Sequence, residues 1–164
     1  MAEPSNGGAA PSSETRRQVI ISAQYIKDLS FENPRAPQSL MQQQSGPPEV
    51  QINVDVKAGS FSPEVYEVIM TLRADAKQGA DSVFVVELIY GAVVTLANTP
   101  QEDVAPALMV ETPRQMFPFA RAILADVTRD GGFTPLLLNP IDFAEIYNRR
   151  VAAAAQQGAG PVTA

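Results

Sequence analysis

The chain of 164 residues contains no cysteine, no histidine and no tryptophan. The lack of cysteine excludes disulfides and cysteine nucleophiles, and without histidine the common zinc sites and the Ser-His-Asp triad are excluded too. Basic residues are few, 12 against 18 acidic ones, and the formal net charge is -6. Such a chain repels a polyanionic backbone and has no basic stripe for phosphates, so we expect no nucleic acid partner.

Long apolar runs are also missing. Residues 1–17 carry Gly, Ser and Pro where a signal peptide needs an apolar core, and no stretch approaches the ~20 apolar residues of a membrane helix. We therefore expect a cytoplasmic protein that does not insert into membranes. Because residues 1–17 and 156–164 are small, polar and rich in Pro and Gly, they are predicted to be flexible tails around one domain at 18–155.

Alternating apolar residues predict a sheet. Val50 to Val56 alternates strictly, with Val and Ile on one side and Gln51, Asn53 and Asp55 on the other, which indicates a half-buried strand. Further strands are predicted at Gln18 to Tyr25, Val65 to Ala74 and Ser82 to Leu96, with turns at Lys57 to Pro63 and around Gly79. The short turns favour an antiparallel meander, and four prolines keep Asn33 to Pro48 out of regular structure.

The last third of the chain has helical spacing. Asp103 to Arg129 predicts either two helices or one kinked helix, because Pro106 and Pro118 interrupt it, and Thr112 to Gln115 resembles a capping box. Asp142 is expected to begin a final helix that runs toward Gly158. Strands followed by helices predict an α+β fold, a four-stranded antiparallel sheet with two helices on one face.

Both faces of the predicted fourth strand are apolar. Phe84, Val86, Leu88 and Tyr90 share one face, and Val83, Val85, Glu87 and Ile89 share the other. Two helices cover only one face of such a sheet. The second face therefore either meets another protein surface or belongs to a central strand that tolerates exposed aliphatic side chains.

A second notable segment, KDLSFE, carries two acids on extended chain. Asp28, Ser30 and Glu32 project to one side, and Leu29 and Phe31 project to the other. The acids form either a solvated strand end or a docking strip for a basic partner. No nucleophile, metal partner or phosphate loop accompanies them, so we expect neither an enzyme nor a cofactor.

Four blocks of the sequence resemble the SecB family of bacterial export chaperones. They are YIKDLSFENPRAP (25–37), VYEV (65–68), FVVELIYG (84–91) and the long block from Phe117 to Tyr147, and the resemblance extends over about residues 18–150. It implies a SecB-like sheet with two helices, assembled as a homotetramer that is a dimer of dimers. It also implies ATP-independent binding of unfolded precursors and their delivery to the SecA ATPase. A general cytoplasmic holdase of the same fold is the alternative.

The resemblance also implies roles for single residues. The motor-docking residues would be Asp28, Glu32, Val85 and Glu87, and the positions that affect assembly would be Val86, Leu88 and Tyr90. Grooves that accept extended segments need apolar and aromatic side chains. On that ground the candidate client-binding residues are Phe31, Leu40, Tyr66 and Phe84.

Overall fold

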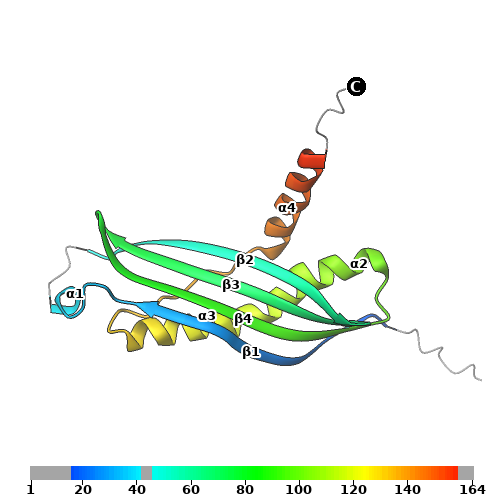
Figure 1. Ribbon diagram of the computed structural model, residues 1–164, viewed down its shortest axis with the longest axis horizontal. Helices are drawn as coiled ribbons and strands as arrows, with labels where there is room; N and C mark the ends of the chain where they lie inside the picture. Colours follow the sequence, from blue (N-terminus) through cyan, green and yellow to red (C-terminus); the bar gives the residue numbers. More distant parts are fainter. Residues whose placement is uncertain (1–15, 42–45, 159–164) are drawn as a thin grey trace, which may run out of the picture.

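The computed structural model describes residues 16–41 and 46–158, and this part of the chain contains one four-stranded antiparallel sheet (Figure 1). The strands are β1 (Gln18–Glu32), β2 (Glu49–Ser62), β3 (Val65–Gln78) and β4 (Asp81–Ala97). A short helix, α1 (Gln38–Met41), lies between β1 and β2. The predicted fold, a four-stranded antiparallel sheet with helices, is confirmed.

The strand order is β1-β4-β3-β2. β2, β3 and β4 follow one another as hairpins, so the predicted meander is confirmed for these three strands. β1 pairs with β4 instead of β2, which makes the sheet a Greek key. β1 and β2 are therefore the two edges of the sheet.

Two predicted strand ends are wrong. The expected turn at Lys57 to Pro63 is mostly strand, because Ala58 to Ser60 pair with Tyr66 to Val68 and the ladder overrides their low strand propensity. Only Pro63 and Glu64 form the turn, with Glu64 at φ 62°. β1 likewise continues past Tyr25 to Glu32 and includes the whole acidic segment.

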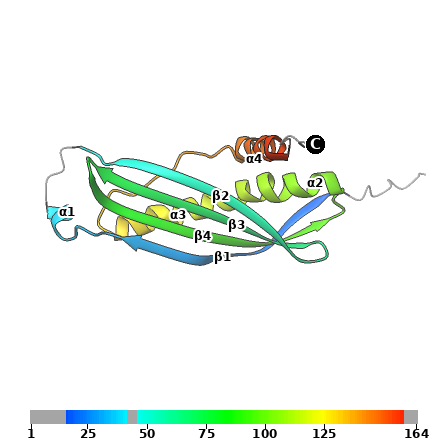
Figure 2. The same cartoon turned by 45° about the horizontal axis from the view of Figure 1, so that its top comes forward.

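One continuous helical segment covers one face of the sheet (Figures 1 and 2). It comprises α2 (Gln101–Pro106), a π-helical stretch η1 (Ala107–Glu111) and α3 (Thr112–Asp130). The capping-box interpretation is wrong, because Thr112 is helical and its hydroxyl donates to the Ala107 carbonyl oxygen at 2.9 Å. The segment is thus one helix with a π-helical interruption.

The last helix, α4 (Phe143–Gly158), begins as predicted. The Glu145 N–H donates to the Asp142 carboxylate at 3.1 Å. The helix ends at Gly158, so residues 156–158, predicted as tail, are helical; the remainder of that tail and residues 1–15 lie outside the described residues. α4 packs against η1 and projects past the β2 edge of the sheet, where Arg150 donates to the Val56 carbonyl oxygen at 2.6 Å.

The core lies between the sheet and the helical segment. Alternate residues of β3 and β4 point into it, and Leu72, Val86 and Leu88 are all fully buried there. Met116 and Leu124 fill the core from α3, and Phe143 fills it from α4. We call the sheet face on the side away from the helices the outer face; no helix of the described chain covers it.

Candidate functional site

The predicted motor-docking residues lie together on the outer face. Strand pairing places Glu32 opposite Val85 and Ser30 opposite Glu87, and Asp28 stands opposite Ile89, two residues further along β4. Asp28 and Glu32 are exposed, while Val85 and Glu87 are half-buried. Residues separated by 53 or more positions of sequence are thereby combined into one surface, as the resemblance implied.

Two further charged residues belong to this surface. On β3, Asp75 lies opposite Val85 and Arg73 lies opposite Glu87. The Arg73 guanidinium contacts the Asp75 carboxylate at 2.9 Å and the Glu87 carboxylate at 3.6 Å. These contacts, that with Asp75 above all, raise the pKa of Arg73.

We call this group the acidic patch: Asp28, Glu32, Arg73, Asp75 and Glu87. It contains four carboxylates and one guanidinium, which contacts two of them, so the patch carries an excess of negative charge suited to a basic surface. The sequence reasoning missed Arg73 and Asp75. The signal was present, because both are odd-numbered residues of β3 and alternate with the apolar Leu72 and Ala74.

The three predicted assembly residues lie inside the chain. Val86 and Leu88 have no exposed surface and Tyr90 has 6%, because they face the helices and not the outer side. Val86 and Leu88 therefore have no surface in this chain to offer another subunit, and an effect of the three residues on assembly stays a prediction. Their partners on β1 are more exposed. Leu29, opposite Leu88, has 36% of its surface exposed, and Ile26, opposite Tyr90, has 48%.

Three phenylalanines form an aromatic cluster where β1 ends and β4 begins. Phe31 and Phe84 are stacked with ring centroids 5.9 Å apart, and Phe133 lies 5.0 Å from Phe84 and 6.2 Å from Phe31. Gly131 permits this packing, since a Cβ there would lie 2.3 Å from the Phe31 ring. A larger residue at position 131 would displace the ring.

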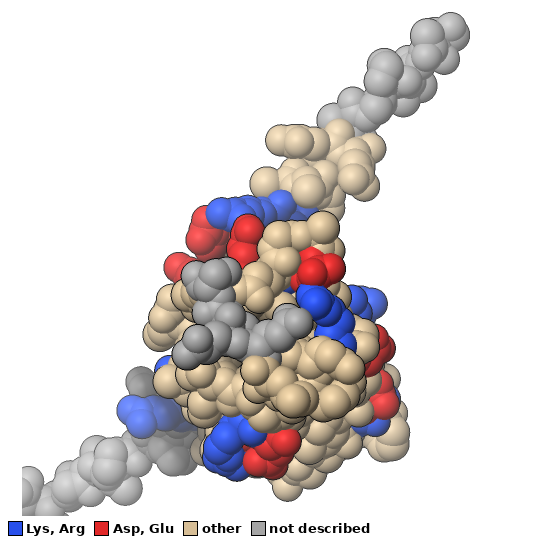
Figure 3. All heavy atoms as spheres, turned by 90° about the vertical axis from the view of Figure 1, so that its left-hand side faces the viewer, with Lys and Arg blue, Asp and Glu red and all other residues tan. Residues whose placement is uncertain are grey.

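A hollow of about 200 Å³ adjoins the cluster, and we call it the Phe133 hollow. Its lining is almost entirely apolar: Pro47, Pro48, Val50, Phe84, Phe133, Thr134, Pro135, Leu136 and Leu137. Leu40 lies close by, because a Cβ on Gly132 would be 3.0 Å from its side chain. Figure 3 views the end of the molecule where α1 lies and shows a mainly uncharged surface with small groups of both signs.

Three of the four predicted client-binding residues, Phe31, Leu40 and Phe84, thus lie around one end of the molecule. They differ in access, since Leu40 is 48% exposed and Phe84 only 2%. Tyr66 is separate: it lines a second hollow at the other end of the sheet. The sequence reasoning missed Phe133 and Leu137, the second of them 66% exposed, although both lie in the block that carries the family resemblance.

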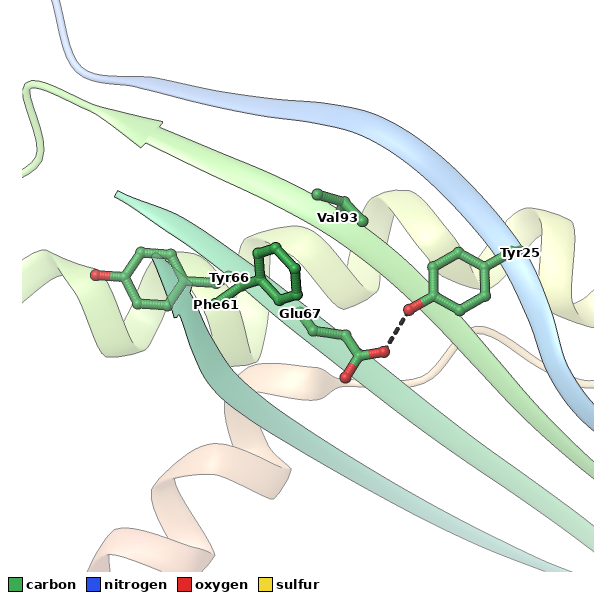
Figure 4. A pocket seen from close by; sticks show the side chains of 5 residues that line it. All are labelled: Tyr25, Phe61, Tyr66, Glu67 and Val93. Atoms are coloured by element: carbon green, nitrogen blue, oxygen red, sulfur yellow. Dashed lines mark hydrogen bonds between the residues drawn. The ribbon is translucent and has the colours of Figure 1, made fainter. Parts of the chain in front are cut away.

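The second hollow has a volume of about 140 Å³, and we call it the Glu67 hollow (Figure 4). It is lined by Tyr25, Phe61, Tyr66, Glu67 and Val93. The Tyr25 hydroxyl donates to the Glu67 carboxylate across β4. Burial and this contact raise the pKa of Tyr25 to about 12, and the hydrogen bond from Tyr25 is the main cause that lowers the pKa of Glu67.

The described part of the chain holds neither a metal-binding cluster nor a membrane-spanning helix. No group of three or more acidic side chains is arranged there to hold a metal ion. None of its helices has the length and apolarity to cross a membrane.

Comparison with known proteins assigns the family. Residues 12–154 match the family model described as preprotein translocase subunit SecB. A protein-export protein SecB from Bradyrhizobium sp. is 47% identical over 93% of this chain and 94% of its own length. Its counterpart in Paramagnetospirillum magneticum is 49% identical over 89% and 94%, and that of Agrobacterium fabrum 52% identical over 80% and 82%.

A solved structure agrees with the fold. The SecB-like chaperone of Mycobacterium tuberculosis, in complex with a peptide from an antitoxin, matches with a TM-score of 0.62. The match covers 75% of this chain and 90% of that one, at 12% identity. At this identity it supports the sheet and helix arrangement alone. With the family model matched over nearly the whole chain and relatives close to half identical, this chain belongs to the SecB family.

Proposed function

We propose that this chain is a cytoplasmic export chaperone that binds unfolded precursor polypeptides without nucleotide and delivers them to the SecA ATPase. The observation that carries the proposal is the presence of two chemically different surfaces on one small body. The acidic patch suits a basic protein surface, and the Phe133 hollow with its aromatic cluster suits an unfolded chain. The names of the relatives support export as the purpose.

Client binding at the Phe133 hollow follows from its chemistry. Extended segments of an unfolded protein expose apolar and aromatic side chains, and the transfer of these side chains out of water lowers the free energy. The hollow offers proline, leucine and phenylalanine and a mainly apolar surface, so it discriminates weakly between sequences. Such binding holds many different clients unfolded by mass action.

We expect the purified protein to slow the refolding and aggregation of a denatured polypeptide in the absence of nucleotide. The sequence has no Gly-rich loop followed by Lys that would hold phosphates, so added ATP should leave the rates unchanged. Light scattering of a client diluted from denaturant measures the effect. A requirement for ATP in client release from the purified protein would contradict the mechanism.

We further propose a homotetramer, a dimer of dimers. Supporting it, apolar side chains stay exposed beside the core: Ile26 and Leu29 on β1, and Phe119 on α3 with 55% exposed. A scattered exposed leucine is ordinary, but three large exposed side chains, two of them on one edge strand, favour a protein contact. Leu88 and Tyr90, for which the resemblance implies an effect on assembly, would then act through their β1 neighbours Leu29 and Ile26.

Light scattering should give about 70 kDa, four times the chain mass of 17.6 kDa. A monodisperse species of one chain mass at micromolar concentration would contradict the assembly, whereas a dimer would remove only its second step. Changing Leu29 to Arg should shift the population toward smaller species, because a charge would enter the contact unpaired. Lys77→Arg is the control, because Lys77 is exposed on β3 and the change keeps its charge.

A general holdase of the same fold is the alternative function. It needs the Phe133 hollow but has no use for a motor-docking surface. Binding to the purified export motor therefore separates the two proposals, and calorimetry measures it directly.

A further inference from the structure

The Glu67 hollow is not needed for either surface assigned above. It lies on the outer face where β3 and β4 run past Tyr25 of β1, several residues away from the acidic patch along both strands. Figure 4 shows Phe61 and Tyr25 on opposite sides of the Glu67 carboxylate, with Val93 nearby. Aromatic walls around one carboxylate are an arrangement that attracts a cation.

The local packing keeps this arrangement in place. Tyr25 lies flat over Gly91, where a Cβ would come within 2.5 Å of the tyrosine ring. Its hydroxyl is held by one oxygen of Glu67, Oε1. Among the described residues, no hydrogen bond reaches the other oxygen, Oε2, so Glu67 retains capacity for a further donor.

The hollow already accepts an ammonium group at its rim. The Lys27 Nζ donates to Glu67 Oε1 at 2.9 Å, and the Lys27 side chain is 49% exposed. Lys27 comes from a β-bulge in β1, between Ile26 and Asp28. It is therefore a surface contact that a cation from outside can displace or share.

The other wall of the hollow is unusual for a soluble surface. Phe61 is 83% exposed at the end of β2, close to the turn that leads into β3. Its ring, with the Tyr25 ring on the other side of the carboxylate, presents aromatic surface on which a flat guanidinium or the apolar stem of a lysine can pack. A volume of about 140 Å³ suits one side chain and not a larger ligand.

We propose that the Glu67 hollow binds a lysine or arginine side chain of an extended segment in an unfolded client polypeptide. This inference rests on the proposed client-binding function and adds a basic subsite to the apolar Phe133 hollow. The outer-face position keeps it open to an extended chain, and its single carboxylate selects for positive charge while its aromatic walls accept the apolar neighbours of that residue.

Two synthetic peptides test the proposal. One has leucines and serines around a single arginine, and the other has citrulline, a neutral isostere, in place of arginine. The wild-type chain should bind the arginine peptide about tenfold more tightly, since a charge-assisted contact and cation–π stacking are both lost with citrulline. Fluorescence anisotropy measures both affinities.

Four variants locate the effect. Glu67→Gln should abolish the arginine preference and leave citrulline-peptide binding unchanged. Lys27→Gln should strengthen arginine-peptide binding, because the internal competitor is gone. Phe61→Ala should weaken it about threefold. Glu64→Gln is the matched control, since Glu64 is exposed on the same hairpin and should behave as wild type.

The outcomes separate this inference from the proposed function. An arginine preference that survives in Glu67→Gln, or falls equally in Glu64→Gln, overturns the subsite while client binding stands. If Glu67→Gln loses motor binding but keeps the preference for the arginine peptide, the hollow belongs to the motor-docking surface. That result also overturns the subsite. If the wild-type chain binds neither peptide, client binding fails and the subsite fails with it.

Discussion

Replacing Asp28 and Glu32 with Lys should weaken binding of the export motor by about 100-fold or more, because like charges would then face the basic surface. Both side chains are exposed on the outer face, so the fold should survive the change. Aggregation suppression should persist, since the Phe133 hollow opens elsewhere. Calorimetry with the purified motor gives the affinity, and client light scattering gives the second activity.

A matched variant, Glu64→Lys with Glu102→Lys, makes the same change in net charge away from the acidic patch. Both glutamates are exposed and have no ion pair among the described residues. It should bind the motor nearly as wild type does.

Wild-type binding should also weaken as salt rises toward physiological concentration, where exposed charges are screened over about 8 Å. Unchanged motor affinity in the Asp28 and Glu32 variant would remove the acidic patch from the mechanism, and simultaneous loss of client binding would show that the two surfaces are one.

The acidic patch shows how far sequence reasoning reaches. Period-2 alternation correctly placed Asp28 and Glu32 on the same side of one strand. It could not place Glu87 beside them, because alternation says nothing about which strands pair. The family resemblance supplied that link, and the register of β1 with β4 confirms that these residues lie on one face.

Arg73 and Asp75 mark the limit. Their alternation with Leu72 and Ala74 was readable, but their nearness to Glu87 depends on the β3–β4 register. The strand ends were missed for a similar reason: Gly59 and Ser60 have weak strand propensity, and the ladder with β3 holds them extended. Long-range pairing is a tertiary property, which local patterns do not encode.

The helical segment shows a different limit. Pro113 after Thr112 has the local signature of a helix start, yet α3 continues from η1 without a break. A proline inside a helix loses one backbone hydrogen bond, and the wider turns of η1 immediately before it accommodate the change. The buried Thr112 hydroxyl satisfies the Ala107 carbonyl oxygen instead of capping a new helix. The sequence alone could not decide between one kinked helix and two helices, because both arrangements use the same residues.

Leu88 and Ile89 lie on opposite faces of β4. We therefore expect the same substitution at the two positions to change the stability of the fold by very different amounts. Leu88 has no exposed surface and packs between the sheet and the helices, whereas Ile89 is half-buried on the outer face. Leu88→Arg would bury an unpaired charge in the core, so we expect it to lower the free energy of unfolding by about 4 kcal/mol or more, enough to unfold many domains.

Ile89→Arg should change stability little, because its side chain reaches water beside the carboxylate of Asp28. Leu88→Ala gives an intermediate case and should cost about 2 to 5 kcal/mol through the cavity that it leaves. Urea unfolding followed by circular dichroism, with all variants at one protein concentration, measures the three effects, since the stability of an assembly depends on concentration. A Leu88→Arg protein that folds with wild-type stability but forms a smaller assembly would contradict this expectation. It would show that position 88 contacts another subunit directly.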